Sequence, residues 1–440
     1  MVSERQYDII IVGAGVLGAT SAYHLIKNNP SKKILVVERY GGAANGNTGR
    51  SNAMFRNTFT SRDNQLLSDA SIDSYLSLQD SGTDIGIRLT GYLWLLSGNQ
   101  LSSNLHSITR MSSDGIGVKT IAKEDLTRSV PTLNTDVSRS EEARLMQLPN
   151  IEGAVFGEKC GRLDAVRLTE HYLQLFKNLG GKVSFGTNVE SLIVKPRVPL
   201  GIDGEPFVWQ DSEIVGMNVS GNLDGEILSD TVVIACGAWN NDLLEKIGMD
   251  GHVKAKKRQI FRIQASGDEA LMKLMQNDGF NRIRTLPFVI LPKNGCFIKA
   301  LPESKEFWVA CDDDFNREYM NNPSPNLDQV RAEPDYYVRS VNPILREYFS
   351  EFKDKAPKSM WAGLYSYNTL DYLPFVFSEH GAIVVGGDSG SGFMKGDSLG
   401  RIVASVYADS DQAELFGNRF YSTSKLGFAR RDVEREEWVI

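Results

Sequence analysis

Cysteine is scarce in this 440-residue chain, and the few that occur exclude several classes of site. Only Cys160, Cys236, Cys296 and Cys311 are present, with no CxxC pair. This usage argues against a disulfide framework and against a cysteine-based zinc or iron–sulfur site. The five histidines form no recognisable pair, so we predict no metal site. We expect a protein of a reducing compartment.

Long apolar runs and an excess of positive charge are also missing. No run approaches the roughly 20 apolar residues that a membrane span needs. Lys and Arg total 48 against 55 Asp and Glu, and a net charge of −7 argues against nucleic-acid binding. Hydrophobic residues make up 41%, an ordinary globular share. We expect a cytoplasmic protein of two or three domain-sized units, with peripheral association at a membrane left open.

The first 40 residues have the pattern of a βαβ unit. Residues 7–12 are a short apolar run rich in isoleucine, typical of a buried parallel strand. A glycine-rich turn, a stretch with helical spacing and a second apolar run at 32–38 follow. The turn reads Gly13-x-Gly15-x-x-Gly18. Such a turn brings backbone amides and a helix N-terminus close to a pyrophosphate.

Glu38 lies at the end of the second strand, 20 residues after Gly18. A carboxylate there can accept hydrogen bonds from both hydroxyls of an adenosine ribose and would repel the 2′-phosphate of NADP. The motif alone does not separate NAD from FAD. No run of further βα units follows, only the polar, glycine-rich stretch 41–52, and this order favours a flavoprotein. A solvated surface loop is the alternative reading of 41–52.

Further buried strands are predicted at 230–235 and 382–386, and a helix at 62–80. Period-2 segments between 255 and 315 indicate a largely antiparallel sheet. This distribution predicts an α/β + β fold, with a Rossmann-like domain assembled from discontinuous segments and an inserted antiparallel-sheet domain. GGDSGSG (386–392) lacks the G-x-S-x-G spacing around Ser389, which excludes a serine hydrolase elbow.

Six motifs in order resemble the D-amino-acid-oxidase-like FAD flavoproteins, which include sarcosine oxidase and glycine oxidase. They are DIIIVGAGVLG…VVE, GNTGRSNAMFR, GRLDAVRLTEHYLQL, VVIACGAW, WAGLYSYNTLDYLP and GGDSGSGFMKGDSLGR. Two segments, Arg197–Gln210 and Ser389–Arg401, particularly resemble archaeal dye-linked L-proline dehydrogenases. The resemblance implies an FAD-binding domain at 1–80, 150–245 and 360–440, and a substrate-binding domain at 81–149 and 246–359.

The resemblance also implies the site residues. Arg56 and Tyr365 are the expected catalytic residues, and Arg56, Tyr365, Arg258 and Lys395 the expected substrate-binding residues. Gln259 lies where the family often lines the pocket, although a solvated basic run is the alternative for most of 254–258. The expected cofactor-binding residues are Gly13, Ala14, Gly15, Val16, Leu17, Gly18, Glu38, Arg39, Asn47, Thr48, Gly49, Arg50, Ser51, Asn52, Val189, Cys236, Gly237, Trp239, Gly363, Gly390, Ser391, Gly392, Phe393, Met394 and Lys395.

Three positions depart from the family pattern. Gly363 replaces the cysteine that can attach flavin covalently, so we expect non-covalent FAD. Ala53 stands where sarcosine oxidase has an arginine beside the flavin, which leaves the role of Arg50 open. Met394 matches the sarcosine-oxidase lysine, and Lys395 is displaced by one position.

We therefore expect oxidation of the C–N bond of a small amino acid, with L-proline converted to pyrroline-5-carboxylate. Electrons would pass to a dye- or quinone-like acceptor, because residues 306–311 carry no basic side chain that would favour reaction with O2. Lys299, on the preceding strand, could overturn that argument. An O2-using amino-acid oxidase and a non-catalytic nucleotide-binding subunit of a larger complex are the alternatives. A homo-oligomer is left open.

Overall fold

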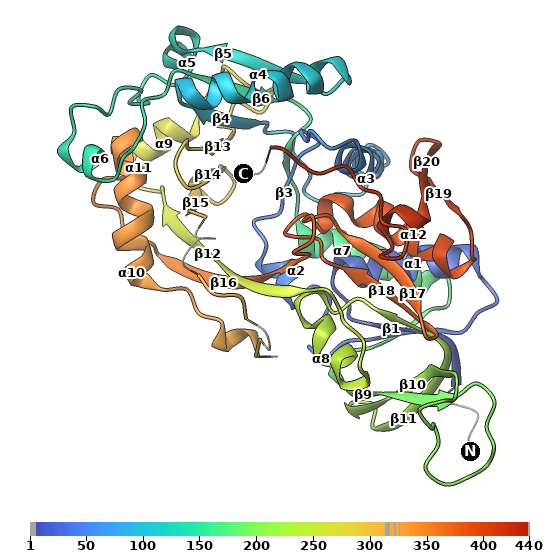
Figure 1. Cartoon of the computed structure of the whole chain (residues 1–440). Helices are drawn as coiled ribbons and strands as arrows, with labels where there is room; N and C mark the ends of the chain where they lie inside the picture. The colour runs from blue at the N-terminus through green and yellow to red at the C-terminus, as the bar shows by residue number, and fades with distance from the viewer. Residues whose placement is uncertain (1–5, 313–316, 321–322, 325, 439–440) are drawn as a thin grey trace.

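Two eight-stranded sheets form the framework of the protein (Figure 1). The structure is a computed structural model that describes residues 6–312, 317–320, 323–324 and 326–438. The first sheet and its helices occupy the lower right of Figure 1, and the second sheet lies at the upper left. Within the described residues, no helix is both long and apolar enough to cross a membrane.

The first sheet is built on five parallel strands. Their order is β18-β11-β1-β2-β8, with β17 antiparallel to β18 at the edge. The strands are β1 (Gln6–Val12), β2 (Ile34–Val37), β8 (Lys182–Ser184), β11 (Gly225–Ile234), β17 (Phe375–Glu379) and β18 (Ala382–Gly386). Both faces are buried, which explains why β1 and β2 read as unbroken apolar runs.

Helices cover one face of this sheet. They are α1 (Val16–Asn28), α3 (Arg62–Asp80), α7 (Ala165–Asn178) and α12 (Gly396–Tyr407). Ile9 and Ile11 of β1 face the core that these helices form. His24 of α1 lies in that core, where its Nε2 is 2.7 Å from Oδ1 of Asp397 at the start of α12. This pair links α1 and α12, the first and last α-helices of the described residues.

The other face is covered by an antiparallel extension of β11. β9 (Thr187–Pro196) pairs with β10 (Ser212–Gly221), which pairs with β11. Ile10 and Val12 face this layer, together with Leu243 and Leu244 of α8 (Asn240–Leu244). The first sheet is therefore the central layer of three.

The second sheet is antiparallel except where β13 runs parallel to β4. Its order is β16-β12-β15-β14-β13-β4-β6-β5. The strands are β4 (Tyr92–Leu96), β5 (Val118–Ala122), β6 (Gly153–Gly157), β12 (Lys254–Gln264), β13 (Phe288–Ile290), β14 (Phe297–Leu301), β15 (Glu306–Ala310) and β16 (Ser359–Tyr367). This agrees with the largely antiparallel sheet expected from the sequence.

Short helices and hairpins complete the chain. The helices are α2 (Asn47–Arg50), α4 (Gly98–Ser113), α5 (Lys123–Ser129), α6 (Glu141–Leu145), α9 (Glu269–Met275), α10 (Pro334–Tyr336) and α11 (Asn342–Tyr348). Residues of α5, α9 and α11 share a core with the second sheet. The two-stranded pairs are β3 (Met54–Phe55) with β7 (Gly161–Arg162), and β19 (Gln412–Leu415) with β20 (Arg419–Ser422).

Two strands of the second sheet come from segments that the sequence assigned to the FAD-binding domain. β6 lies within 150–245, and most of β16 lies within 360–440. In Figure 1, β16 runs from the second sheet toward the first. We propose to keep the predicted division of the chain and to move these two strands to the substrate-binding domain.

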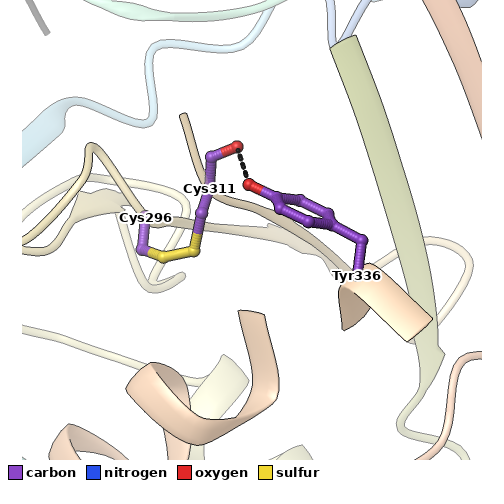
Figure 2. Close-up of a disulfide and its surroundings, with 3 residues drawn as sticks. All are labelled: Cys296, Cys311 and Tyr336. Carbon is purple, nitrogen blue, oxygen red and sulfur yellow. Dashed lines mark hydrogen bonds between the residues drawn. A yellow bond between two sulfur atoms is a disulfide. The ribbon is translucent and has the colours of Figure 1, made fainter. Parts of the chain in front are cut away.

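Cys296 and Cys311 form a disulfide at the open end of the β14–β15 hairpin (Figure 2). The hairpin register pairs Phe297 with Ala310, and so brings the two cysteines face to face. The backbone carbonyl of Cys311 also accepts a hydrogen bond from the hydroxyl of Tyr336, at 3.2 Å. One bond is not a disulfide framework, but it removes the scarcity of cysteine as an argument for a reducing compartment. The pairing follows from the strand register, which the spacing of the cysteines in the sequence does not reveal.

Candidate functional site

The glycine turn after β1 folds as the motif predicts. Gly13 has a φ of +103°, and a Cβ there would lie 2.6 Å from the carbonyl oxygen of Ala235. A Cβ at Gly18 would overlap the carbonyl oxygen of Gly13. The first and third glycines therefore allow α1 to begin directly at the ends of β1 and β11. The N-terminus of α1 consequently faces the space beyond those strand ends.

Glu38 closes the other side of this turn. Its Oε2 accepts a hydrogen bond from the backbone N–H of Ala14 at 2.7 Å, and its Oε1 accepts one from Tyr40 N at 2.9 Å. The carboxylate is buried and lines a cavity of about 310 Å³. It is thus fixed at the position where the motif predicts a ribose partner.

The same smaller cavity collects several other predicted cofactor residues. These are Gly13, Gly15, Arg39, Asn47, Thr48, Val189, Cys236, Gly237 and Trp239. The guanidinium carbon of Arg39 lies 4.3 Å from the centroid of the Trp239 ring. Trp239 therefore lies at the cavity wall, although tryptophan at such a position is more often part of a core.

The polar stretch 41–52 is built into the site, so its reading as a solvated loop is wrong. It contains α2, where the Thr48 hydroxyl oxygen accepts a hydrogen bond from Val16 N at 3.2 Å. The Asn47 side-chain oxygen accepts one from Leu364 N at 2.8 Å. These contacts fix α2 between the N-terminus of α1 and strand β16.

A larger cavity of about 450 Å³ adjoins the first. Gly15, Asn47, Thr48 and Ala235 line both. The predicted residues on the wall of the larger cavity are Val16, Leu17, Arg50, Ser51, Asn52, Arg56, Arg258, Gly363, Tyr365, Gly390, Ser391, Gly392, Phe393, Met394 and Lys395. Gln259 lines it as well. The structure thus brings together residues from five separate stretches of the chain.

Three predicted residues line neither cavity. Ala14 is buried and acts through its N–H to Glu38. Gly18 packs against the turn, and a Cβ at Gly49 would lie 2.5 Å from the carbonyl oxygen of Ala44. Arg50 lines the larger cavity, but its guanidinium donates to the carbonyl oxygens of Leu327 and Ala362 at 2.8 and 3.0 Å. These bonds attach α2 to strand β16 and to the turn that contains Leu327.

The turn after β18 forms one wall of the larger cavity. The Tyr365 ring packs directly over Gly390, which has a φ of +84° and no room for a Cβ. A 3-10 turn (Phe393–Lys395) then leads into α12, which begins at Gly396. The buried Tyr75 hydroxyl donates to the Phe393 carbonyl at 2.7 Å and accepts from Asp397 N at 3.1 Å. Tyr75 therefore fixes the start of this helix against the cavity.

Two buried cations on the cavity wall lie close to the same aromatic ring. The Arg56 guanidinium carbon lies 4.2 Å from the centroid of the Phe59 ring, and Lys395 Nζ lies 5.2 Å from it. Burial lowers the pKa of Arg56 from its ordinary value and lowers the pKa of Lys395 to about 7. Lys395 Nζ donates to the Ser391 hydroxyl at 2.7 Å. Despite its offset of one position, Lys395 points into the cavity region.

Arg258 differs from Arg56 in having a counter-ion. Its Nη2 lies 2.9 Å from an Asp312 carboxylate oxygen and donates to the Tyr367 hydroxyl at 2.6 Å. Its guanidinium carbon is 5.2 Å from the centroid of the Tyr365 ring. Nearby Lys256 is buried and lies over the Tyr319 ring, so reading 254–258 as a solvated run is wrong for that residue.

The two adjoining cavities fit a dinucleotide cofactor. The smaller one has the buried Glu38 carboxylate, where the motif predicts a ribose partner, and aromatic and aliphatic walls. The larger one has the N-terminus of α1, the α2 hydroxyl and amide groups, and the small-residue turn 390–392. Gly15 lies where the cavities meet, and a side chain there would enter that shared space. This arrangement suits a pyrophosphate with an adenosine at one end and a flavin ring at the other.

Residues 8–406 match the family model described as "FAD dependent oxidoreductase". The chain belongs to this FAD-dependent oxidoreductase family. FAD is therefore the cofactor, and the fold predicted from the sequence is confirmed.

Individual proteins show the same likeness. FAD-dependent oxidoreductase domain-containing protein 1 of Xenopus laevis is 23% identical over 91% of this chain and 79% of its own length. The L-proline dehydrogenase of P. horikoshii has a similar fold, with a TM-score of 0.68 at 20% identity over 92% of this chain and 94% of that one. Glycine oxidase of Geobacillus kaustophilus also has a TM-score of 0.68, at 18% identity over 92% and 95%.

Sequence reasoning missed several residues of the larger cavity. Phe59 and Asn64 follow Arg56 in the chain and line the cavity, as do Phe288 and Phe297 of the second sheet. Tyr92 of β4 lines it too. Glu436 reaches it from the end of the chain. Phe59 and Asn64 lie close to Arg56 in the sequence, and this proximity is the one local signal that could have indicated them.

Proposed function

We propose that this protein oxidises the C–N bond of a small amino acid, with L-proline as the substrate and a dye- or quinone-like compound as the acceptor. L-Proline would lose two hydrogens and become pyrroline-5-carboxylate. Bound FAD supplies the chemistry by accepting a hydride equivalent from the carbon next to the nitrogen. The protein residues bind and orient the substrate.

The buried guanidinium of Arg56 is the observation that carries this proposal. Arg56 donates to the Thr58 carbonyl at 3.0 Å, and no carboxylate among the described residues lies within ion-pair distance of it. A buried charge of this kind needs a partner. A substrate carboxylate in the adjoining cavity would provide it through two parallel hydrogen bonds. Arg258 is a weaker candidate for this anchor, because Asp312 already balances its charge.

Other residues would orient the bound amino acid. Lys395 lies across Phe59 from Arg56 and adds positive charge at the same end of the cavity. Tyr365 lines the cavity and is held by Gly390 on one side and by the Arg258 guanidinium on the other. Phe59, Phe288 and Phe297 give the wall an apolar surface that suits a ring of methylene groups. These features support a compact substrate with one charged end.

The similar fold of an L-proline dehydrogenase and of a glycine oxidase agrees with an amino-acid substrate. A non-catalytic nucleotide-binding subunit is a poorer reading, because such a subunit would not need a buried arginine and an ordered tyrosine in the second cavity.

One observation favours a second candidate, an amino-acid oxidase that uses O2. Lys299 of β14 is buried, and its Nζ donates to the backbone carbonyl of Asn52, in the loop that lines the larger cavity. A fixed cation close to the flavin would stabilise superoxide and speed reaction with O2. The argument from the lack of a basic side chain at 306–311 is correspondingly weaker.

Product analysis with a chemical acceptor tests the proposal. The purified protein would be given L-proline and an artificial dye without oxygen, and the product identified by mass spectrometry. We expect dye reduction together with a product two hydrogens lighter than proline. Dye reduction by glycine or sarcosine but not by L-proline would reject proline and keep the reaction class. No reduction by any small amino acid would reject the proposal.

A further inference from the structure

The C-terminal segment of the chain forms part of the larger cavity. In Figure 1 it runs between the two sheets, past α3. Glu436 lines the cavity together with Arg56, Asn64 and Lys395. Trp438 is buried two residues later, with its ring 5.4 Å from that of Trp94. A residue almost 400 positions from Arg56 in sequence therefore belongs to the same site.

Hydrogen bonds hold the Glu436 carboxylate in place. One oxygen accepts from the backbone N–H and the hydroxyl of Thr60, both at 2.9 Å, and from Trp438 N at 3.1 Å. The other accepts from Ser61 N at 3.2 Å and from the Asn64 side-chain amide at 3.1 Å. These five donors hold the carboxylate at the N-terminus of α3.

This carboxylate acts on the two cations of the site. The charge of Glu436 favours the protonated forms of both Arg56 and Lys395, against the effect of their burial. It forms no direct ion pair with either, since its oxygens are taken by the five donors. Glu436 therefore offsets part of the positive charge in the cavity without filling the anchor position of Arg56.

We propose that Glu436 limits the site to substrates with a single carboxylate and disfavours amines that carry two. This inference rests on the proposed oxidation of a carboxylate-bearing amine. With Glu436 present, Arg56 and the protonated form of Lys395 face one fixed anion, and one substrate carboxylate completes the balance. A second substrate carboxylate would meet the fixed anion in a buried setting where repulsion is strong.

Sarcosine and iminodiacetate are matched probes, because both are secondary amines and differ by one carboxylate. The ratio of kcat/KM for sarcosine to that for iminodiacetate would be measured for the wild type and three variants. In Glu436→Gln we expect this ratio to fall by about tenfold or more, as expected from removing one buried charge. Glu436→Asp retains the charge and should keep most of the selectivity.

Glu434→Gln is the structural control. Glu434 accepts from Arg62 N at 2.7 Å and pairs with Arg110, so it anchors the same segment but does not line the cavity. An unchanged ratio in Glu436→Gln, or an equal fall in Glu434→Gln, would overturn the proposal. If neither amine is oxidised, the L-proline assay still decides the proposed function, and binding decides the role of Glu436.

Binding is measured with acetate and malonate, by the change each causes in the visible spectrum of the FAD-loaded protein. At a pH where malonate is a dianion, we expect the wild type to bind acetate more tightly than malonate. Glu436→Gln should gain at least about tenfold for malonate relative to acetate. Tighter binding of malonate than of acetate by the wild type would contradict the inference, even if the variant does not fold.

Discussion

The side-chain ammonium of Lys299 donates a hydrogen bond to the backbone carbonyl of Asn52. Lys299 belongs to β14 of the second sheet, whereas Asn52 closes the loop that lines the flavin side of the larger cavity. Lys299 Nζ also lies 4.2 Å from the centroid of the Trp308 ring. A cation of the second sheet is thus fixed against the loop that follows α2.

We expect this contact to make any reaction with oxygen depend on pH. Burial lowers the pKa of Lys299 to about 7, so the side chain is charged below that pH and loses its charge above it. We expect the protein to behave as a dehydrogenase and to release peroxide in air much more slowly than it reduces a dye. Any residual oxygen reaction should be faster at lower pH, because the protonated lysine stabilises superoxide.

Replacing Lys299 tests the origin of that reaction. Lys299→Met should abolish its pH dependence around neutrality, while Lys305→Met, at an exposed position on the next turn, should not. Peroxide formed as fast as dye is reduced by the wild type would reject the dehydrogenase and support the oxidase.

Binding of a simple carboxylate should weaken as the pH rises through about 7. Burial lowers the pKa of Lys395 to about 7, so the site holds two cations below this pH and mainly Arg56 above it. Acetate has no amine to titrate, and its dissociation constant should rise by up to about tenfold between pH 6 and 8. Lys395→Met should bind acetate weakly and with little change over this range. A wild-type constant that stays flat would contradict this role of Lys395.

Removing the arginine anchor should mainly harm use of the substrate. Arg56→Ala should lower kcat/KM for the best amino acid. The loss in transition-state stabilisation calculated from the kcat/KM ratio should be about 2–5 kcal/mol, the usual cost when one partner of a buried charge pair is removed. Arg197→Ala is the control, because Arg197 is exposed and pairs with Glu213. Steady-state kinetics at saturating dye would show the difference. Equal kcat/KM for wild type and Arg56→Ala would mean that another group holds the carboxylate.

FAD should leave the protein when it is denatured. Gly363 of β16 lines the larger cavity and offers no sulfur for a covalent bond. Acid precipitation should therefore release the yellow chromophore into the supernatant. The precipitate of wild type and of Gly363→Cys can be compared directly. Flavin retained in the wild-type precipitate would show attachment through another residue.

Local sequence predicted the cofactor end of the site well. The apolar runs of β1 and β2, the glycine turn and Glu38 are close in sequence, and their physical roles follow from spacing alone. Helix α3 (Arg62–Asp80) also has the predicted bounds. It begins after Ser61, whose hydroxyl caps Asn64 N at 3.3 Å, a signal that short-range pattern carries.

The substrate end depends on pairing between distant segments, which spacing does not reveal. Glu436 meets Thr60 only because the C-terminal segment crosses α3. Lys299 meets Asn52 because β14 lies inside the second sheet, and the same hairpin register pairs Cys296 with Cys311. Buried Lys256 reads as part of a charged run until β12 takes its place between β15 and β16. Register and sheet order supplied these contacts.

The visible spectrum of the purified protein, recorded before and after addition of L-proline without oxygen, tests the central claim most directly. The spectrum before addition should show bound oxidised flavin. L-Proline should bleach that absorption, and a chemical acceptor added afterwards should restore it. A flavin spectrum that stays unchanged with L-proline and with other small carboxylate-bearing amines would contradict the proposal that this cavity oxidises amino acids.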